Sequence, residues 1–181
     1  EELVARGLDV ILSEADRLSG LVEDLLDFSR IQSGRMAVNV MPIDVSQLLC
    51  AVSDMYTELA SKQGIELSYT PPQQSSIVMG DPDRLKQVFI NVIDNAVKYT
   101  EEGRGRLQLS LTETETAVHL TLTDNGKGVK ETELPSLFQA FYRTDKARTQ
   151  VAKGSGLGLH ICQSIIEAMP GKIWAESAAP R

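Results

Sequence analysis

A single apolar pattern in the first thirty-four residues constrains the fold of this 181-residue chain more than any other feature. Charged side chains cover one side of the segment, and Gly34 is typical of a helix end. A long helix packed on its own domain would show the same pattern. Because no second helix follows closely enough to be an antiparallel partner, we favour one long helix that packs against another chain or a segment outside this sequence. The apolar residues repeat at alternating steps of three and four, the spacing of a bundle or coiled-coil seam: Leu8, Ile11, Ala15, Leu18, Val22 and Leu25.

Residues 35–181 show a different pattern, in which short strands alternate with helices. Strict alternation of apolar residues on both sides of a short link, 113–116, predicts an antiparallel hairpin. We therefore predict an α+β fold: a two-layer α/β sandwich with a mixed, largely antiparallel sheet and helices on one face, preceded by the long bundle-forming helix. Extended segments are expected at 36–43, 65–70, 77–79, 107–111, 118–123 and 172–176, and helices at 45–63 (with Ser46 as its cap), after Asp81, at 134–141 and at 157–168.

The composition is that of a globular protein, with 42% hydrophobic and 24% charged residues. The net charge of −7 argues against nucleic acid or an anionic membrane as a partner, because both attract basic surfaces. No apolar run approaches the roughly 18 residues that a membrane span needs. Cys50 and Cys162 lack metal-ligand spacing, so we expect reduced thiols in a cytoplasmic protein.

The helix after Asp81 carries a polar stripe beside its apolar face. Asp81 is expected to cap this helix, and Pro82 to lie in its first turn. Asn91, Asn95 and Lys98 stand at i, i+4 and i+7, within about 60° of one another around the helix. Amide oxygens can bind a hard cation, and an ammonium group can bind phosphate. A solvated helix face would show the same stripe, so the pattern alone leaves both interpretations open.

Two glycine-containing segments are further candidates for ligand binding. The segment 124–129, Asp-Asn-Gly-Lys-Gly-Val, directly follows a predicted strand. Its glycines would let a flat ligand approach the backbone, and Asp124 can accept a hydrogen bond, although Asp-Asn-Gly is also a common turn. The segment 154–159, Gly-Ser-Gly-Leu-Gly-Leu, precedes a predicted helix whose N-terminus would attract phosphate. It matches neither the P-loop nor the dinucleotide-binding fingerprint.

These three segments occur in order in one chain, with Phe138 and Phe141 between the second and the third. The set resembles the catalytic ATP-binding domain of sensor histidine kinases of two-component systems. The residues from Asp24 to Gly34 resemble the end of the second helix of that family's dimerisation and histidine-phosphotransfer hairpin. The resemblance implies that residues 1–34 form this helix and that residues 35–181 form the catalytic domain. The four motifs are similar to the family's N box (Asn91–Thr100), G1 box (Asp124–Gly128), F box (Leu137–Phe141) and G2 box (Gly154–Leu159).

The resemblance also implies a role for each matching residue. Asn95 would give an oxygen to Mg²⁺, Asn91 would assist at the metal and phosphates, and Lys98 would contact phosphate oxygens. Asp124 would accept a hydrogen bond from the adenine amino group. Residues 144–153 would form the lid over ATP. The residues expected to contact the nucleotide are Asn91, Asn95, Lys98, Tyr99, Asp124, Gly126, Gly128, Val129, Phe141, Arg143, Gly154, Ser155, Gly156, Leu157, Gly158 and Leu159.

The implied reaction transfers the γ-phosphoryl group of Mg-ATP to a histidine, for relay to an aspartate of a response-regulator receiver domain. ATP-hydrolysing relatives place a glutamate base where Asn91 stands, and an asparagine cannot deprotonate water, so hydrolysis is disfavoured. A module that only binds nucleotide is a second alternative, against which Asn95, Asp124 and the G2 glycines argue. In the longer protein we expect a homodimer through the helical hairpin, with any membrane contact through segments outside this chain.

The sequence departs from the family pattern at both ends. The phospho-accepting histidine of such kinases lies in the first helix of the hairpin, but the only histidines here are His119 and His160. We expect His119 to lie on the strand surface and His160 to have a local packing role. The acceptor is therefore expected on a preceding helix, and a further strand is expected to follow Ser177; both are expected to be absent from this chain.

Overall fold

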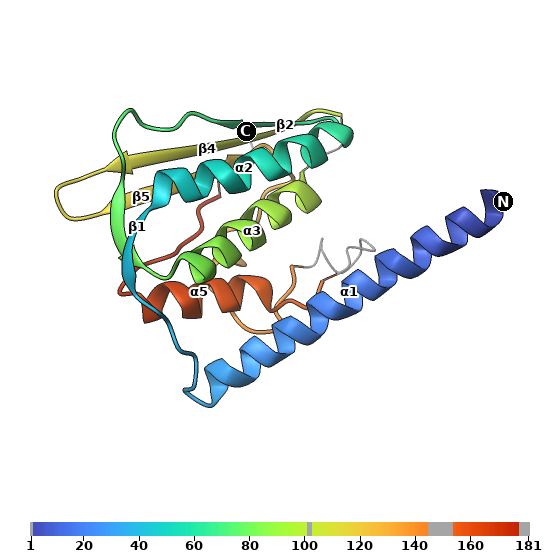
Figure 1. The fold of residues 1–181 in the computed structure, drawn as a ribbon, viewed down its shortest axis with the longest axis horizontal. Coiled ribbons are helices and arrows are strands. Elements are labelled where there is room, and N and C mark those ends of the chain that lie inside the picture. The colour runs from blue at the N-terminus through green and yellow to red at the C-terminus, as the bar shows by residue number, and fades with distance from the viewer. Residues whose placement is uncertain (1, 101–102, 145–153, 178–181) are drawn as a thin grey trace.

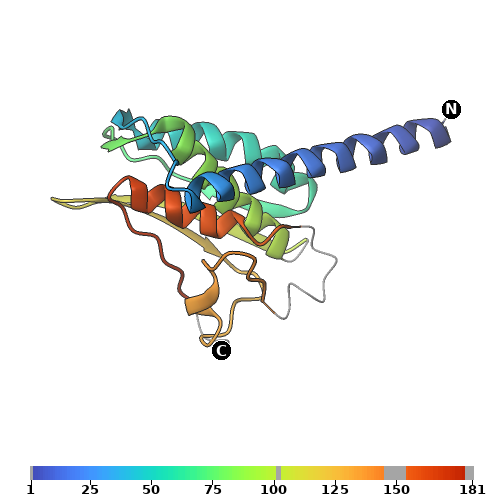
Figure 2. The same ribbon diagram turned by 90° about the horizontal axis from the view of Figure 1, so that it is seen from below.

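A long N-terminal helix, α1 (Glu2–Gln32), extends beyond the remainder of the molecule (Figure 1). The computed structural model describes residues 2–100, 103–144 and 154–177. The predicted helix end at Gly34 is confirmed, because this glycine has a φ of +66° and the amide of Arg35 donates to the carbonyl of Arg30 at 2.9 Å. Seen from below, the later part of α1 passes α5 (Gly158–Ala168), and its beginning extends away (Figure 2).

The predicted apolar stripe of α1 is exposed to solvent in this structure. Its large members have between 52% and 65% of their surface exposed, and they are Leu8, Ile11, Leu18, Val22 and Leu25. Apolar groups in such a row are stabilised only when another surface covers them. No helix among the described residues is long and apolar enough to cross a lipid bilayer.

The strands form two sheets that confirm the predicted mixed topology. The larger has the order β2 (Ile65–Tyr69), β4 (Gly105–Glu113) and β5 (Val118–Asp124). Strand β2 runs parallel to β4, whereas β4 and β5 form the expected antiparallel hairpin. The smaller sheet pairs β1 (Met41–Asp44) antiparallel to β3 (Ile77–Gly80).

Three helices pack together with the larger sheet to form the core. Helix α2 (Val45–Lys62) contacts β2, α3 (Pro82–Tyr99) contacts β4 and β5, and α5 packs on α3. Alternate residues of β4 are buried toward this layer, which is the period expected of a half-buried strand. Fully buried side chains from α2, β2, α3, β4 and α5 meet in one cluster, among them Leu49, Ile65, Ile93, Leu107 and Ile161.

The starts of α2 and α3 are fixed by aspartate caps. The predicted cap of α3 is confirmed: Asp81 Oδ1 accepts hydrogen bonds from the amides of Asp83 (3.0 Å) and Arg84 (3.1 Å). For α2 the prediction of Ser46 is wrong, because Asp44 caps this helix and accepts from the Ser46 amide at 3.0 Å. An aspartate and a serine are both good caps, so sequence alone did not choose between neighbouring candidates.

Two predicted elements are absent from the described residues. Residues 172–176 form no strand, although Ile173 is more buried than its neighbours, because such alternation reports burial and not pairing with a neighbouring strand. The segment 134–141 contains only the 3₁₀ turn η1 (Leu134–Ser136). Phe141 has a φ of +63°, which no right-handed helix contains, so a helix cannot continue to the end of this segment.

Candidate functional site

Three contacts bring the N, G1, F and G2 boxes together, although 67 residues separate Asn91 from Gly158 in the chain. The N box meets the G2 box at Asn91 and Gly158, where a Cβ atom placed on the glycine would lie 3.9 Å from the Asn91 Cγ atom. A methyl group fits there, but longer side chains would displace the amide. The start of α5 therefore faces the polar stripe of α3.

The Asn91 amide has an unsatisfied donor at this junction. Its Nδ2 atom is buried and has no oxygen or nitrogen partner within the described residues; the Cys162 thiol, a weak acceptor, is its neighbour. Buried polar atoms without partners are rare in folded proteins and require an explanation. A bound group with acceptor oxygens would supply the missing partner.

The N box meets the G1 box at the C-terminal end of α3. A Cβ atom on Gly126 would lie 2.8 Å from the carbonyl oxygen of Tyr99 and 2.7 Å from Asp124 Oδ1. Both distances are too short for any side chain, so glycine is required for this close approach. The Gly126 amide donates to Asp124 Oδ1 at 2.8 Å, which orients this exposed carboxylate at the end of β5.

The F box meets the G2 box through the main chain of Phe141 and Gly156. The Phe141 amide donates to the Gly156 carbonyl at 2.9 Å, and both residues have positive φ, +63° and +74°. A Cβ atom on Gly156 would lie 3.0 Å from the Phe141 carbonyl carbon. The entry to the predicted lid is thus fixed to the glycine turn, whereas lid residues 145–153 lie outside the described residues.

The remaining residues predicted to bind the nucleotide lie near these three junctions, and some of them have other partners in this structure. Asn95 is half-buried one turn after Asn91, and Lys98 forms an ion pair with Asp94. Gly128 has a φ of +63°, and the Val129 amide donates to Ser177 Oγ at 3.3 Å. Tyr99, Asp124 and Gly154 are exposed, Arg143 and Leu159 are half-buried, and Leu157 is fully buried.

Three residues of α1 contact the G2 box, the F box or α3. The sequence analysis did not predict these contacts. Asp24, one of the charged residues opposite the apolar stripe, is half-buried and accepts a hydrogen bond from Ser155 Oγ at 2.6 Å. Asp27 is only 7% exposed and contacts α3, and the Phe28 ring packs on Phe141. The spacing 24, 27, 28 and 31 places Asp24, Asp27, Phe28 and Ile31 on one helix face, and this spacing was the available signal.

Comparison with known proteins places this geometry in a family. Residues 80–181 match the family described as the histidine kinase-, DNA gyrase B- and HSP90-like ATPases. The chain belongs to this ATPase family. The matched range begins just before the α3 cap and includes all four boxes, so the predicted resemblance is confirmed.

Relatives within the family are sensor histidine kinases. The chain is 39% identical over 163 residues to the signal transduction histidine-protein kinase BaeS of Escherichia coli (strain K12), covering 90% of this chain and 34% of BaeS. It therefore spans about a third of the length of this relative.

Solved structures of histidine kinases share the fold. Full-length ShkA in complex with AMPPNP matches with a TM-score of 0.74 and 28% identity, over 91% of this chain and 35% of ShkA. ThkA in complex with the response regulator TrrA matches with a TM-score of 0.72 and 25% identity, over 94% of this chain and 46% of that chain. Both matches extend into α1, because residues 35–181 alone are a smaller share of the chain than either match covers.

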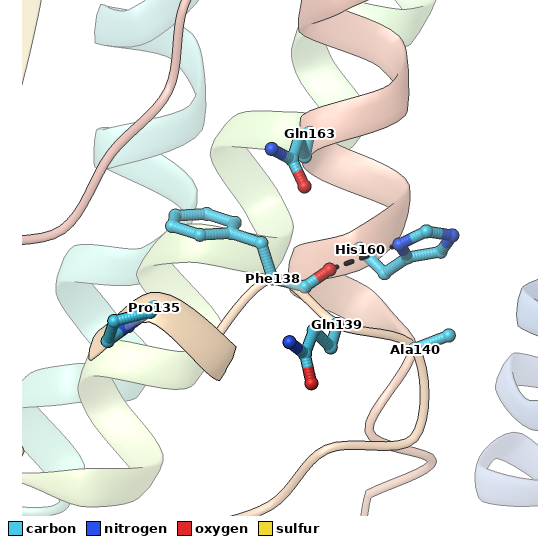
Figure 3. Close-up of a pocket in the computed structure, with 6 residues that line it drawn as sticks. All are labelled: Pro135, Phe138, Gln139, Ala140, His160 and Gln163. Carbon is cyan, nitrogen blue, oxygen red and sulfur yellow. Dashed lines mark hydrogen bonds between the residues drawn. The ribbon is translucent and has the colours of Figure 1, made fainter. Parts of the chain in front are cut away.

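The two histidines of this ATPase-family chain take the expected positions. His119 is exposed on β5, and its ring lies 6.4 Å from that of Trp174. His160 Nδ1 lies 3.0 Å from the carbonyl oxygen of Phe138, so this nitrogen carries the proton and donates. Figure 3 shows the His160 ring on the side that faces α1. The ring also lies 5.8 Å from that of Phe28, in agreement with the expected packing role, while its buried Nε2 atom has no hydrogen-bond partner within the described residues.

A groove of about 370 Å³ lies beside His160, between the F box and α5 (Figure 3). Its lining includes Pro135, Phe138 and Gln163, but none of Asn91, Asn95 and Asp124. The groove therefore borders the F box, but it contains none of the residues expected to hold the metal ion or the adenine.

The residues present fit a magnesium ion held mainly by ligand oxygens. In the part of the chain that the structure describes, no group of three or more His, Cys, Asp or Glu side chains could hold a metal ion. Mg²⁺ is bound in proteins by few side chains together with water and phosphate oxygens. The half-buried amides of Asn91 and Asn95, one turn apart and beside the G2 box, match this requirement.

Cys162 is buried against α3. It lies fully buried on α5, and burial raises the pKa of its thiol to about 12. The thiol therefore remains protonated and packs as a small apolar side chain.

Proposed function

We propose that this chain is the kinase core of a sensor histidine kinase, which transfers the γ-phosphoryl group of ATP to a histidine side chain. The observation that carries the proposal is the convergence of the four boxes at Asn91–Gly158, Tyr99–Gly126 and Phe141–Gly156. The kinship with BaeS and the AMPPNP complex of ShkA support the same reaction class.

In the proposed site, the adenine amino group donates to Asp124 at the end of β5. Gly126 and Gly128 keep side chains away from the base, since the first has no room for a Cβ atom and the second has a positive φ. Tyr99 and Val129 lie beside the base. The phosphates lie at the glycine turn, where Gly154, Ser155, Gly156, Leu157, Gly158 and Leu159 precede or begin α5. The positive end of this helix favours the phosphate charge.

The polar stripe of α3 would hold the metal and the terminal phosphates. Asn95 would bind Mg²⁺, with Asn91 assisting and Lys98 exchanging its Asp94 partner for a phosphate oxygen. When bound, the metal ion neutralises charge on the phosphates and orients them. The protein itself contributes positioning: the four boxes align the nucleotide, and Phe141 and Arg143 begin the cover that excludes water.

Asparagine at position 91 favours phosphotransfer over hydrolysis. An amide cannot remove a proton from water, so water cannot be activated by this residue. The attacking nucleophile must therefore be one that needs no base at position 91, and a neutral imidazole is such a nucleophile. Neither His119 on β5 nor His160 behind the F box fits this role, and we propose that the acceptor lies on a helix outside this sequence.

The organisation of the longer protein follows from the same proposal. Residues 1–34 would be the second helix of the phosphotransfer hairpin, and residues 35–181 the catalytic domain. The exposed α1 stripe would be covered by a four-helix bundle across two chains, giving a homodimer. The complex of ThkA with TrrA supports a response-regulator receiver domain as the next phosphate acceptor. Such a core acts in the cytoplasm.

Titration calorimetry with ADP, ATP and GTP tests the proposal on this chain. We expect both adenine nucleotides to bind and GTP to bind far more weakly, since guanine presents a carbonyl where adenine presents the amino group. Equal binding of GTP would contradict the assignment of Asp124. Steady ATP hydrolysis by the chain, without any phosphohistidine in the longer protein, would contradict the kinase assignment.

A further inference from the structure

The C-terminal part of α1 is joined to the glycine turn by a charged hydrogen bond. Ser155 Oγ donates to Asp24 Oδ2 at 2.6 Å, across 131 residues of sequence. The same hydroxyl oxygen accepts a hydrogen bond from the Leu157 amide at 3.1 Å. The Leu157 amide stands at the start of α5, where the helix has unpaired donors and partial positive charge. A carboxylate of α1 thus lies at the end of α5 that would attract phosphate.

Two further contacts hold α1 in this position. Asp27 is buried against α3, where Arg84 Nη1 donates to both of its carboxylate oxygens at 3.2 Å and Gln87 Nε2 donates at 2.7 Å. The Phe28 ring lies between two rings of the catalytic part, with centroid distances of 5.3 Å to Phe141 and 5.8 Å to His160. We call Asp24, Asp27 and Phe28, with the partners named here, the α1 latch.

We propose that the α1 latch and the nucleotide phosphates compete for the glycine turn, so that the latched molecule is a low-affinity state. The inference rests on the proposed function, because it assumes that the G2 box binds phosphate. With α1 docked, the Ser155 hydroxyl already donates to Asp24, and the Asp24 carboxylate repels a second anion. Phosphate binding at the turn requires the Ser155 hydroxyl and removes the partner of Asp24.

The competition must act in both directions. If α1 docking weakens nucleotide binding by a given factor, nucleotide weakens α1 docking by the same factor. The Phe28–Phe141 contact extends the effect to the last residue of the F box, because release of α1 also removes a packing partner of the residue that is hydrogen-bonded to Gly156. A signal that moves α1 would change the nucleotide affinity without touching the nucleotide.

The first test compares ADP affinity in the whole 181-residue chain and in latch variants. Asp24→Asn keeps the shape and an acceptor but removes the charge, and Asp24→Ala removes both. Asp27→Ala releases α1 without altering the charge beside Ser155. We expect each to tighten ADP binding by about fivefold or more, the lower range of typical coupling between sites. Asp16→Asn, an equal loss of charge at an exposed position of α1, should leave the affinity unchanged.

A double variant tests whether Asp24 and Asp27 affect ADP affinity through the same docking of α1 or through two independent effects. Because release of α1 already removes Asp24 from the turn, Asp24→Ala in an Asp27→Ala background should add little to the affinity. Full additivity of the two effects would contradict the latch. Unchanged or weaker ADP binding in Asp24→Asn, with wild-type binding intact, would overturn this inference alone. Absence of ADP binding in every variant would overturn the proposed function as well.

A distance measurement observes the latch without relying on affinity. Spin labels at Ser13→Cys on α1 and Lys86→Cys on α3, both exposed positions, are placed in a Cys50→Ser background. We expect a narrow distance distribution without nucleotide and a second, longer population with saturating ADP. An unchanged distribution at saturating ADP would contradict the proposal.

Discussion

The amide nitrogen of Phe141 lies 2.9 Å from the carbonyl oxygen of Gly156, and both residues have a left-handed backbone conformation. This hydrogen bond joins the end of the F box to the middle of the G2 box. It fixes where the predicted lid leaves the folded core, at the end of α5 that faces Asn91.

Substitution of Gly156 by alanine should therefore destabilise the chain. An alanine at a φ of +74° costs about 1–2 kcal/mol, and its Cβ atom would also lie 3.0 Å from the Phe141 carbonyl carbon. Urea unfolding measures the loss. Gly154→Ala is the matched control, since a Cβ atom there meets nothing within 4 Å, and it should leave stability nearly unchanged. Equal stability of both variants would show that the turn tolerates side chains at Gly156.

Asp124→Ala should abolish or strongly weaken adenine-nucleotide binding. The carboxylate is already oriented by the Gly126 amide, so its second oxygen is available to accept from adenine. Titration calorimetry with ADP measures the loss, and unfolding is followed in parallel because the substitution also removes the contact with Gly126. Glu115→Ala, an exposed carboxylate in the β4–β5 link, is the control and should bind as the wild-type chain does. ADP affinity in Asp124→Ala equal to the control would rule out this residue as the adenine acceptor.

Asn95 should determine the metal dependence of nucleotide binding. Asn95→Ala removes an oxygen ligand and should raise the Mg²⁺ concentration required for ATP binding, whereas Asn95→Asp keeps an oxygen and adds charge, which should change that requirement differently. Mg²⁺ titrations at fixed ATP measure both effects. Asn39→Ala, an exposed amide outside the site, serves as the comparison. If neither Asn95 variant shifts the titration, the α3 stripe at Asn95 is a solvated face.

Asp81 should make the stability of the chain depend on pH in the acid range. Its burial would raise the pKa of this carboxyl, but hydrogen bonds from the amides of Asn39, Arg84 and Asp83 outweigh it and hold the pKa below its ordinary value of 3.8. A pKa lower in the folded than in the unfolded state stabilises the protein above the unfolded value, and the stabilisation disappears as the pH falls through the folded value.

The measurement for Asp81 is the unfolding free energy of wild type and Asp81→Asn as a function of pH. The wild type should be the more stable near neutrality, and its advantage should shrink once the pH falls below about 4. Asp9→Asn, an exposed residue of α1, should show no such dependence. A difference between wild type and Asp81→Asn that stays constant down to about pH 2 would contradict the assigned pKa direction.

Elements with local signals were predictable from sequence, and elements that depend on distant partners were not. The α3 cap at Asp81 and the β4–β5 hairpin are encoded within a few residues, by a cap followed by proline and by strict alternation. The segment 172–176 has strand-like alternation but no strand partner. The same limit applies to the site: glycine spacing identified the boxes, but no local pattern indicated that Asp24 would contact Ser155, 131 residues away.

The most direct test of the kinase assignment is labelling with ATP that carries a labelled γ-phosphate. The 181-residue chain should bind Mg-ATP and remain unlabelled, while a longer version with the preceding helix should acquire label that is acid-labile and base-stable, as a phosphoramidate is. Stoichiometric labelling of the 181-residue chain itself, lost when His119 or His160 is replaced, would contradict the assignment of the acceptor to a helix outside this sequence.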